Sequence, residues 1–313
     1  MENKSEVREF ILLGLTSDHS QQRLLFVFFL LLYMACLLGN GAILTIVLAS
    51  PQLHTPMYFF LGNLSCQDIC ISTVTVPKIL SGFLMAHQTT SYIECLIQLH
   101  FFHFLGCSEA ILLGIMAYDR YVAICNPLRY SVIMNKEVCL MLAVATWTAS
   151  FCYALMNTIM TSRLWFCGRN VVQHFVCDIK PLLELACSST ALNLTLLNVV
   201  VGLIAVASFF VTLLSYFYII SFLFFKFQTW QSRWKAFSTC VSHLTVVTLY
   251  LVPPILNYML PSTGNSSERE MIITLAYVII TPVLNPLIYT LRNQDVKSSL
   301  SKIITRKLLT GRI

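Results

Sequence analysis

The charged pair Asp119-Arg120 lies near the end of a long apolar stretch, within residues 116–125 (MAYDRYVAIC). Charges in the last turn of a buried helix destabilise it unless each has a partner. Arg120 follows Cys95 by 25 residues, a helical distance of about 37 Å that is enough to cross a bilayer. We therefore predict one helix with a cysteine on one side of a membrane and an ionic switch on the other. The alternative is an ordinary charged helix end.

Two further acids, Asp68 and Glu109, fall inside apolar stretches, where an ionisable group costs several kcal/mol unless it is paired. Glu109 precedes Arg120 by 11 residues, close to three helical turns, so both side chains point along one face. We expect one polar centre, with room for a water cluster or for a sodium ion at Asp68 and Glu109. Its expected members are Asn40, Asp68, Glu109 and Asn285. A static hydrogen-bonded cluster that orders the helices is the alternative.

The residues with catalytic chemistry do not combine into an enzyme site. No arrangement of Ser, His and Asp supplies nucleophile, base and orienting acid on one aqueous face. No His and Cys spacing fits zinc, and no Gly-rich phosphate loop is present. We expect no catalytic residue, no cofactor and no metal beyond the sodium candidate. A membrane transporter or channel is the less favoured alternative, because neither repeated broken helices nor a polar pore stripe is found.

The composition requires a membrane. Hydrophobic residues make up 57% of the chain and charged residues 11%, against about 25% charged in soluble domains. On the Arg120 side, the loops and tail hold twelve Lys and Arg residues against three acids, so this side is expected to be cytoplasmic. The basic surface is therefore juxtamembrane, and no nucleic-acid partner is expected.

Seven apolar stretches of spanning length predict an all-α membrane protein, a bundle of seven transmembrane helices in one domain, 1–313. They lie at about 24–49, 57–83, 95–123, 139–161, 191–225, 236–260 and 271–291. Residues 1–23 are expected to form a free extracellular tail with a glycan at Asn3, and 292–313 a cytoplasmic tail that begins with a short amphipathic helix.

Four of the cysteines lie on the expected outer side, where disulfides persist. Four cysteines allow three pairings. We favour Cys95–Cys177 together with Cys167–Cys187, since a bridge from Cys95 to the long 162–190 loop would fold that loop over the mouth of the bundle.

Five motifs in the same order resemble those of vertebrate olfactory (odorant) receptors, which are rhodopsin-like G-protein-coupled receptors. The resemblance extends from Phe10 to about Lys297. The motifs are residues 53–61 (LHTPMYFFL), residues 116–125, Ser215-Tyr216 with Ile219, residues 235–240 (KAFSTC) with 242–244 (SHL), and residues 282–293 (PVLNPLIYTLRN).

The resemblance implies the Cys95–Cys177 bridge, a second bridge in the same loop and the glycan at Asn3. It also implies binding of a small volatile odorant in the outer half of the bundle, at the plasma membrane, and signalling through the stimulatory G protein of olfactory neurons, which raises cyclic AMP.

The expected ligand site is mostly apolar, lies between the third, fifth, sixth and seventh helices and has no fixed charge, so a small neutral compound fits it best. For any one of these residues, plain helix packing is the alternative. The expected lining is Phe102, His103, Gly106, Cys107, Ala110, Val200, Ile204, Ala205, Tyr250, Pro253, Pro254, Asn257, Leu275 and Val278.

At the cytoplasmic end we expect Asp119 to hold Arg120 in the resting state and the inner end of the sixth helix to move away on activation. The residues assigned to this switch and to G-protein coupling are Asp119, Arg120, Tyr121, Tyr216, Lys235, Asn285, Pro286 and Tyr289. Two features depart from the family pattern. The double proline Pro253-Pro254 is expected to kink the sixth helix, and Lys180 stands where a small residue or proline is usual.

Overall fold

The computed structural model describes residues 7–16, 18–85, 88–168, 170–226, 230–259 and 266–291, together with 296 and 298. For residues 230–240 it describes the backbone alone. The sequon at Asn3, the side chain of Lys235 and nearly all of the tail at 292–313 therefore lie outside the described part of the chain.

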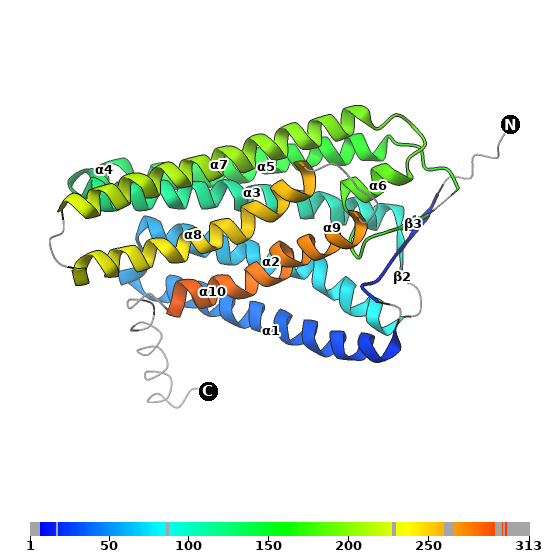
Figure 1. Cartoon of the computed structure of the whole chain (residues 1–313), viewed down its shortest axis with the longest axis horizontal. Coiled ribbons are helices and arrows are strands. Elements are labelled where there is room, and N and C mark those ends of the chain that lie inside the picture. Colours follow the sequence, from blue (N-terminus) through cyan, green and yellow to red (C-terminus); the bar gives the residue numbers. More distant parts are fainter. Residues whose placement is uncertain are drawn as a thin grey trace.

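Seven long helical segments run side by side in the described residues (Figure 1). Six of them are long and apolar enough to cross a membrane, and α8 differs because its inner half carries polar and basic residues. The segments are α1 (His19–Ala49), α2 (Pro56–Leu84), α3 (Tyr92–Cys125), α5 (Lys136–Ser162), α7 (Ala191–Lys226), α8 (Trp230–Met259) and a continuous rod of α9 (Ser266–Leu275), η3 (Ala276–Ile280) and α10 (Thr281–Leu291). The predicted all-α bundle is confirmed.

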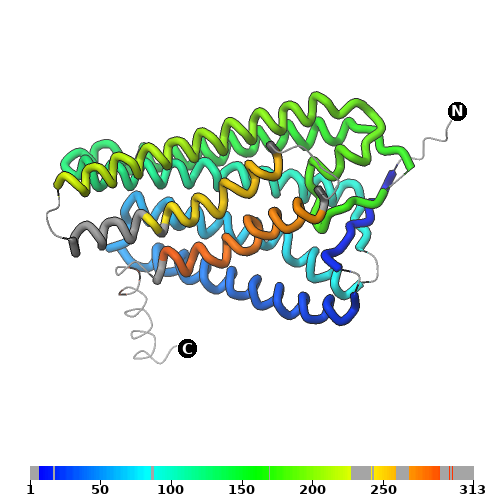
Figure 2. Tube along the Cα trace, in the orientation of Figure 1, coloured from blue at the N-terminus to red at the C-terminus, as the bar shows by residue number. Residues whose placement is uncertain are grey.

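The third long helix, α3, lies at the centre of the bundle and packs against α2, α5 and α7. Figure 2 shows α1 along one side, α7 along the opposite side, and α8 and α10 next to each other between them. Large apolar side chains face lipid on the outer surfaces, for example Leu38 of α1 and Phe217 of α7. Polar side chains turn inward, as expected where no water satisfies them.

The helix ends follow from local capping groups. Ser91 and Glu94 form a capping box at the start of α3: the Ser91 hydroxyl accepts from the Glu94 amide, and the Glu94 carboxylate accepts from the Ser91 amide. Asp18 caps α1 by accepting from the Ser20 amide at 2.8 Å. These caps place the starts of α1 and α3 several residues before their apolar stretches.

A small sheet closes the outer end of the bundle (Figure 1). Strand β1 (Glu9–Leu12) lies between β2 (Gln88–Ser91), which is antiparallel to it, and β3 (Val171–Val172), which is parallel. Phe10 is buried and contacts Phe166 edge-on at 5.2 Å. The expectation of a free tail at 1–23 is therefore wrong for residues 9–12. Alternating burial of Phe10 and Leu12 stabilises this strand, and α1 already begins at His19.

Both expected disulfides are present. Cys95 at the start of α3 bonds to Cys177, and Cys167 bonds to Cys187. Together they hold the loop between α5 and α7 over the bundle, and the loop contains the short helix α6 (Ile179–Leu185).

At the opposite end lie three short helices, η1 (Pro51–Leu53), η2 (Pro127–Arg129) and α4 (Tyr130–Ile133). In the outer part of the bundle, α8 continues through Pro253 and Pro254 without ending.

Candidate functional site

A cavity of about 70 Å³ lies in the half of the bundle nearer the small sheet. It is bounded by α2, α3, α5, α7, α8 and the turn η3, and nearly all of its wall is apolar. The lining residues are Ile71, Phe102, His103, Gly106, Cys107, Ala110, Tyr153, Val201, Ile204, Ala205, Tyr250, Leu251, Pro254, Tyr258 and Tyr277.

Most of the expected ligand residues meet at this cavity. On α3 the expected stripe lines it without a gap, from Phe102 to Ala110 along one face. Ile204, Ala205, Tyr250 and Pro254 also lie in its wall.

Five expected residues do not line the cavity: Val200, Pro253, Asn257, Leu275 and Val278. In four cases the adjacent residue does, namely Val201, Pro254, Tyr258 and Tyr277. An α-helix turns by about 100° per residue, so an error of one position moves a side chain to another face.

In the seventh helical segment, the error in predicting the cavity-facing residues has a specific structural cause. Its turn η3 is π-helical, and the Thr281 hydroxyl donates to the Ala276 carbonyl five residues earlier at 3.1 Å. A π turn adds about one residue to the local repeat, so a 3.6-residue period is lost across it. This shift brings Tyr277 to the cavity and leaves Val278 and Leu275 away from it.

Sequence reasoning missed six lining residues: Ile71, Tyr153, Val201, Leu251, Tyr258 and Tyr277. Tyr153 lies on α5, an element that was not considered for the site. A usable signal existed for the three tyrosines, since each is an amphipathic ring inside an apolar stretch.

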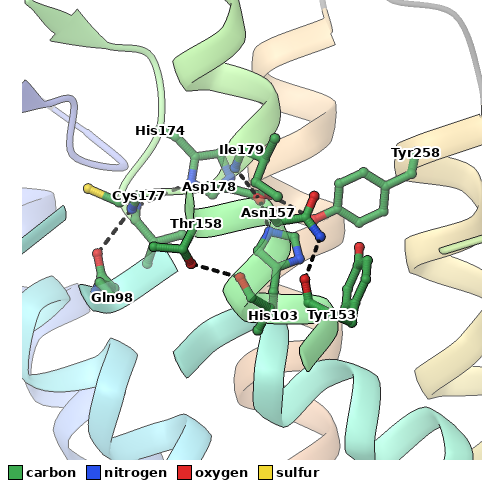
Figure 3. A network of polar contacts seen from close by, with 12 residues as sticks. Gln98, His103, Tyr153, Asn157, Thr158, His174, Cys177, Asp178, Ile179 and Tyr258 are labelled. Atoms are coloured by element: carbon green, nitrogen blue, oxygen red, sulfur yellow. Dashed lines mark hydrogen bonds and ion pairs between the residues drawn. The ribbon is translucent and has the colours of Figure 1, made fainter. Parts of the chain in front are cut away.

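The loop over the cavity is tied to three helices by Asp178 and Lys180. The carboxylate of Asp178 lies 2.9 Å from Nε2 of His103 on α3, and its other oxygen accepts from the Tyr258 hydroxyl of α8 at 2.9 Å (Figure 3). Asp178 also caps α6 through the Ile179 amide. Burial alone would raise the pKa of Asp178, but the hydrogen bond and charge of His103 outweigh it and hold this pKa below its ordinary value.

His174 lies behind this carboxylate and is buried. Its Nδ1 accepts from the Val176 amide at 3.2 Å. Burial lowers the pKa of His174 to about 4, although the Asp178 charge opposes this effect. The imidazole is therefore neutral at physiological pH.

Lys180 joins the loop to the outer ends of α8 and α9. Its Nζ donates to the Asn257 carbonyl at 3.0 Å and to the Glu270 carboxylate at 2.5 Å. Burial, and secondly the charge of Glu270, raise the pKa of the nearby Glu184. The loop helix thus carries a paired cation at the position where we expected a small residue or proline.

Beneath the cavity, the expected polar centre is assembled. The amide Nδ2 of Asn285 donates to both oxygens of Asp68, at 3.1 and 3.0 Å. Asn40 donates to the Pro282 carbonyl at 3.0 Å. Glu109 is buried, and its carboxyl interacts with Asp68, Tyr250 and Asn285.

Close helix contact holds this centre together. A Cβ atom on Gly39 would lie 2.9 Å from Cβ of Pro286, so α1 reaches α10 at this depth only because residue 39 is a glycine. Asn40 is the next residue on α1, which explains how its amide reaches the α10 backbone.

The residues of the centre offer oxygen ligands. Oδ1 of Asn40, Oε1 of Glu109 and Oδ1 of Asn285 are buried and accept no hydrogen bond from the described protein. A hard cation such as sodium prefers carboxylate and amide oxygens, so this donor set fits it. No cluster of three or more His, Cys, Asp or Glu side chains in the described residues could hold another metal.

At the end of the bundle opposite the sheet, the observed contact of Asp119 differs from the expected pairing with Arg120. Asp119 is buried and accepts from the Tyr130 hydroxyl of α4 at 2.9 Å. Among the described residues the ion pairs are His103–Asp178 and Lys180–Glu270, so the expected Asp119–Arg120 pair is not formed. The neutral Tyr130 donor takes its place because α4 packs beneath the end of α3.

His243 of α8 lies close to Tyr216 and Tyr289, two of the other switch residues. Its ring lies 5.7 Å from that of Tyr216 and 6.3 Å from that of Tyr289, and the Arg120 charge acts on both His243 and Tyr289. Tyr121 packs against the apolar cluster that contains Tyr216, and its ring lies 5.8 Å from that of Tyr218 in a tilted arrangement.

The family model described as "Olfactory receptor" matches residues 29–307. The chain belongs to the olfactory receptor family. It is 54% identical to human olfactory receptor 12D1 over 308 residues, covering 98% of this chain and 96% of that protein. It is 52% identical to human olfactory receptor 12D2, covering 98% and 100%, and 41% identical to rat olfactory receptor 1f45, covering 97% of each.

As an olfactory receptor, the chain is an odorant receptor of the G-protein-coupled class and a multi-pass membrane protein rather than an enzyme. The family match does not favour the transporter or channel alternative. The cavity of this receptor is the candidate odorant site.

Proposed function

We propose that this receptor binds a small, neutral, mostly apolar odorant in the cavity between α3, α5, α7, α8 and η3, and then activates a stimulatory heterotrimeric G protein that raises cyclic AMP. The observation that carries the proposal is an apolar cavity whose wall residue Tyr250 interacts with Glu109 of the polar centre beneath it.

The path begins at Tyr250, which lines the cavity and whose hydroxyl donates to the Gly106 carbonyl at 3.0 Å. Tyr250 also interacts with Glu109, which shares the polar centre with Asp68 and Asn285. An odorant that moves Tyr250 therefore changes a group in contact with the centre.

From the centre, α10 carries the path inward. Asn285 and Tyr289 lie on this one helix, and the Tyr289 ring neighbours His243 of α8. The charge of Arg120 acts on both rings. In this proposal the inner end of α8 moves away from α3 on activation.

The movement opens a crevice for the G protein, which is lined by Arg120, Tyr216 and Tyr289. Tyr121 and Lys235 lie at the rim of this crevice, and Pro286 provides the flexible point of α10.

A ligand shifts such an equilibrium only by its difference in affinity for the two arrangements. The proposal adds sodium as a ligand of the resting arrangement, held by Asp68 and Glu109 with amide oxygens of Asn40 and Asn285. Sodium would neutralise one of the two buried carboxylates.

We also propose that the sheet end faces outward, with the amino terminus and the Asn3 sequon outside and the carboxyl terminus in the cytoplasm. Two supports are independent. The basic residues concentrate on the Arg120 side, as is usual for the cytoplasmic face. Both disulfides lie at the sheet end, and disulfides persist in the oxidising environment outside the cell.

The experiment expresses the surface-labelled receptor with a cyclic AMP reporter and applies neutral volatiles. The proposal predicts that at least one raises cyclic AMP, and that a bulky substitution in the cavity, Gly106→Phe, abolishes this response at equal surface labelling. A response that survives Gly106→Phe would place the odorant elsewhere.

A further inference from the structure

Most polar groups in the cavity wall already have partners within the protein. Tyr250 donates to the Gly106 carbonyl, Tyr258 donates to Asp178, and Nε2 of His103 faces the same carboxylate. An odorant would have to break one of these contacts to use these three side chains.

Two hydroxyls in the wall are different. The phenol groups of Tyr153 and Tyr277 are buried, with exposed fractions of 9% and 6%, and neither makes a hydrogen bond of ordinary geometry. The nearest polar neighbours are Asn157 for Tyr153, and Thr274 and Tyr258 for Tyr277. Buried hydroxyls without a partner are rare in proteins.

Packing fixes both rings. Tyr153 contacts His103 with ring centroids 6.3 Å apart, and Figure 3 shows the two rings side by side beneath the loop. Tyr277 contacts Phe102 and Tyr250, at 6.2 and 6.4 Å. The two rings are thus held at defined positions in the wall, on α5 and on the π turn.

We propose that Tyr153 and Tyr277 are specificity-determining residues that donate hydrogen bonds to the odorant, and that its chemical class is a compact neutral compound with a carbonyl oxygen, such as a ketone. The inference rests on the proposed function and assigns the ligand class of that same site. A carbonyl oxygen accepts from a phenol and brings no donor of its own that would require a further partner.

The cavity argues against charged ligands. A carboxylate or ammonium group would enter an apolar space with no opposite charge available, because His103 and Tyr258 already engage Asp178. A hydrocarbon of the same shape would fill the space and leave both hydroxyls unpaired. The expected preference for the carbonyl is about tenfold in affinity for each hydroxyl that finds its acceptor.

The test uses pairs of compounds that exchange C=O for C=CH₂ with little change of shape: cyclohexanone with methylenecyclohexane, and acetophenone with α-methylstyrene. Thermal stabilisation of the purified receptor measures binding, and the cyclic AMP reporter measures signalling. The variants Tyr153→Phe and Tyr277→Phe remove one hydroxyl each and keep the ring. Tyr33→Phe, on α1 away from the cavity, is the matched control.

The inference predicts that the wild-type receptor and Tyr33→Phe prefer a ketone over its alkene about tenfold or more, and that the preference falls in at least one cavity variant. Equal binding of ketone and alkene to the wild type would overturn it without any variant. So would a preference that both cavity variants retain. Ketone binding without cyclic AMP would sustain the inference and refute the proposed signalling, and absence of binding by either member of both pairs would refute both.

Discussion

The ammonium group of Lys180 lies 2.5 Å from the carboxylate of Glu270, so the loop helix α6 is joined by a nearly buried ion pair to the outer end of α9. The same ammonium donates to the Asn257 backbone of α8. Two residues earlier, Asp178 accepts from Tyr258. One short loop segment thus fixes adjacent residues of α8.

The first prediction concerns this pair. Lys180→Met leaves Glu270 buried without a cation and close to Glu184, so it should destabilise the receptor by about 3 kcal/mol. Glu270→Gln should cost less, because Lys180 keeps the Asn257 carbonyl and the charge of Glu184. Thermal unfolding of the purified receptor measures both.

The exchange Lys180→Glu with Glu270→Lys should recover part of the loss, and Glu268→Gln, an exposed neighbour, is the control. If Lys180→Met unfolds at the same temperature as the control, the pair has no stabilising role.

The second prediction is a loss of stability in acid. The pKa of His174 is about 4 in the folded receptor and about 6.5 when unfolded, so the unfolded chain binds more protons between these values. Stability should therefore fall as the pH drops from 6.5 towards 4, by on the order of 3 kcal/mol. Asp178, whose folded pKa is lowered, contributes stability that is lost only at still lower pH, below its ordinary value.

His174→Asn checks this origin, since an amide oxygen can accept from the Val176 amide but does not titrate. Thermal unfolding from pH 7.5 to 4.5 should show a smaller decline in the variant. Parallel declines would assign the acid sensitivity to another group.

The third prediction concerns the polar centre. Asp68→Asn and Glu109→Gln each remove a carboxylate from the group around Asn285, so each should change basal cyclic AMP. Each should also abolish the stabilisation of the wild type by sodium over an equal concentration of choline. Unchanged basal activity in both variants would leave the centre with a packing role alone, and an absence of sodium stabilisation in the wild type would exclude the ion.

The fourth prediction ranks the two disulfides. Cys95 and Cys177 are 82 residues apart and Cys167 and Cys187 only 20, so the first bridge should stabilise the receptor by about 1 kcal/mol more. It also ties α3 to the loop above the cavity. Replacing Cys95 by Ser should therefore reduce surface labelling more than replacing Cys167 by Ser. A larger loss of surface labelling from the Cys167 replacement would show that the Cys167–Cys187 bridge matters more for folding.

Much of this architecture follows from the sequence for clear reasons. Hydropathy locates the membrane spans because few charged residues are tolerated in lipid. Acids and amides in the middle of a span are stable only when they face the bundle interior and pair with one another. The meeting of Asp68 with Asn285 was predictable in this way. The pairing of Cys95 with Cys177 was chosen among three possible pairings and was implied by the family resemblance.

Other contacts depend on details of the folded backbone that the hydrophobic periodicity of the sequence does not predict. The π turn brings Tyr277 to the cavity, where a regular helical period had predicted Val278. On α8 the prediction was wrong by one position, so that Tyr258 lines the cavity and Asn257 does not. The strand at Phe10 needs two partners distant in the chain. Lys180 was noticed as unusual, but its carboxylate lies 90 residues away, and only the folded loop brings Glu270 to it.

The most direct test of the account compares Arg120→Ala with the wild type and with Arg163→Ala, an exposed arginine at the outer end of α5, using surface labelling and the cyclic AMP reporter with an agonist ketone. The account predicts near-normal surface labelling for all three, ordinary signalling from Arg163→Ala, and a signal reduced at least tenfold for Arg120→Ala, about 1.4 kcal/mol or more of lost coupling. Full signalling from Arg120→Ala at equal surface labelling would contradict it.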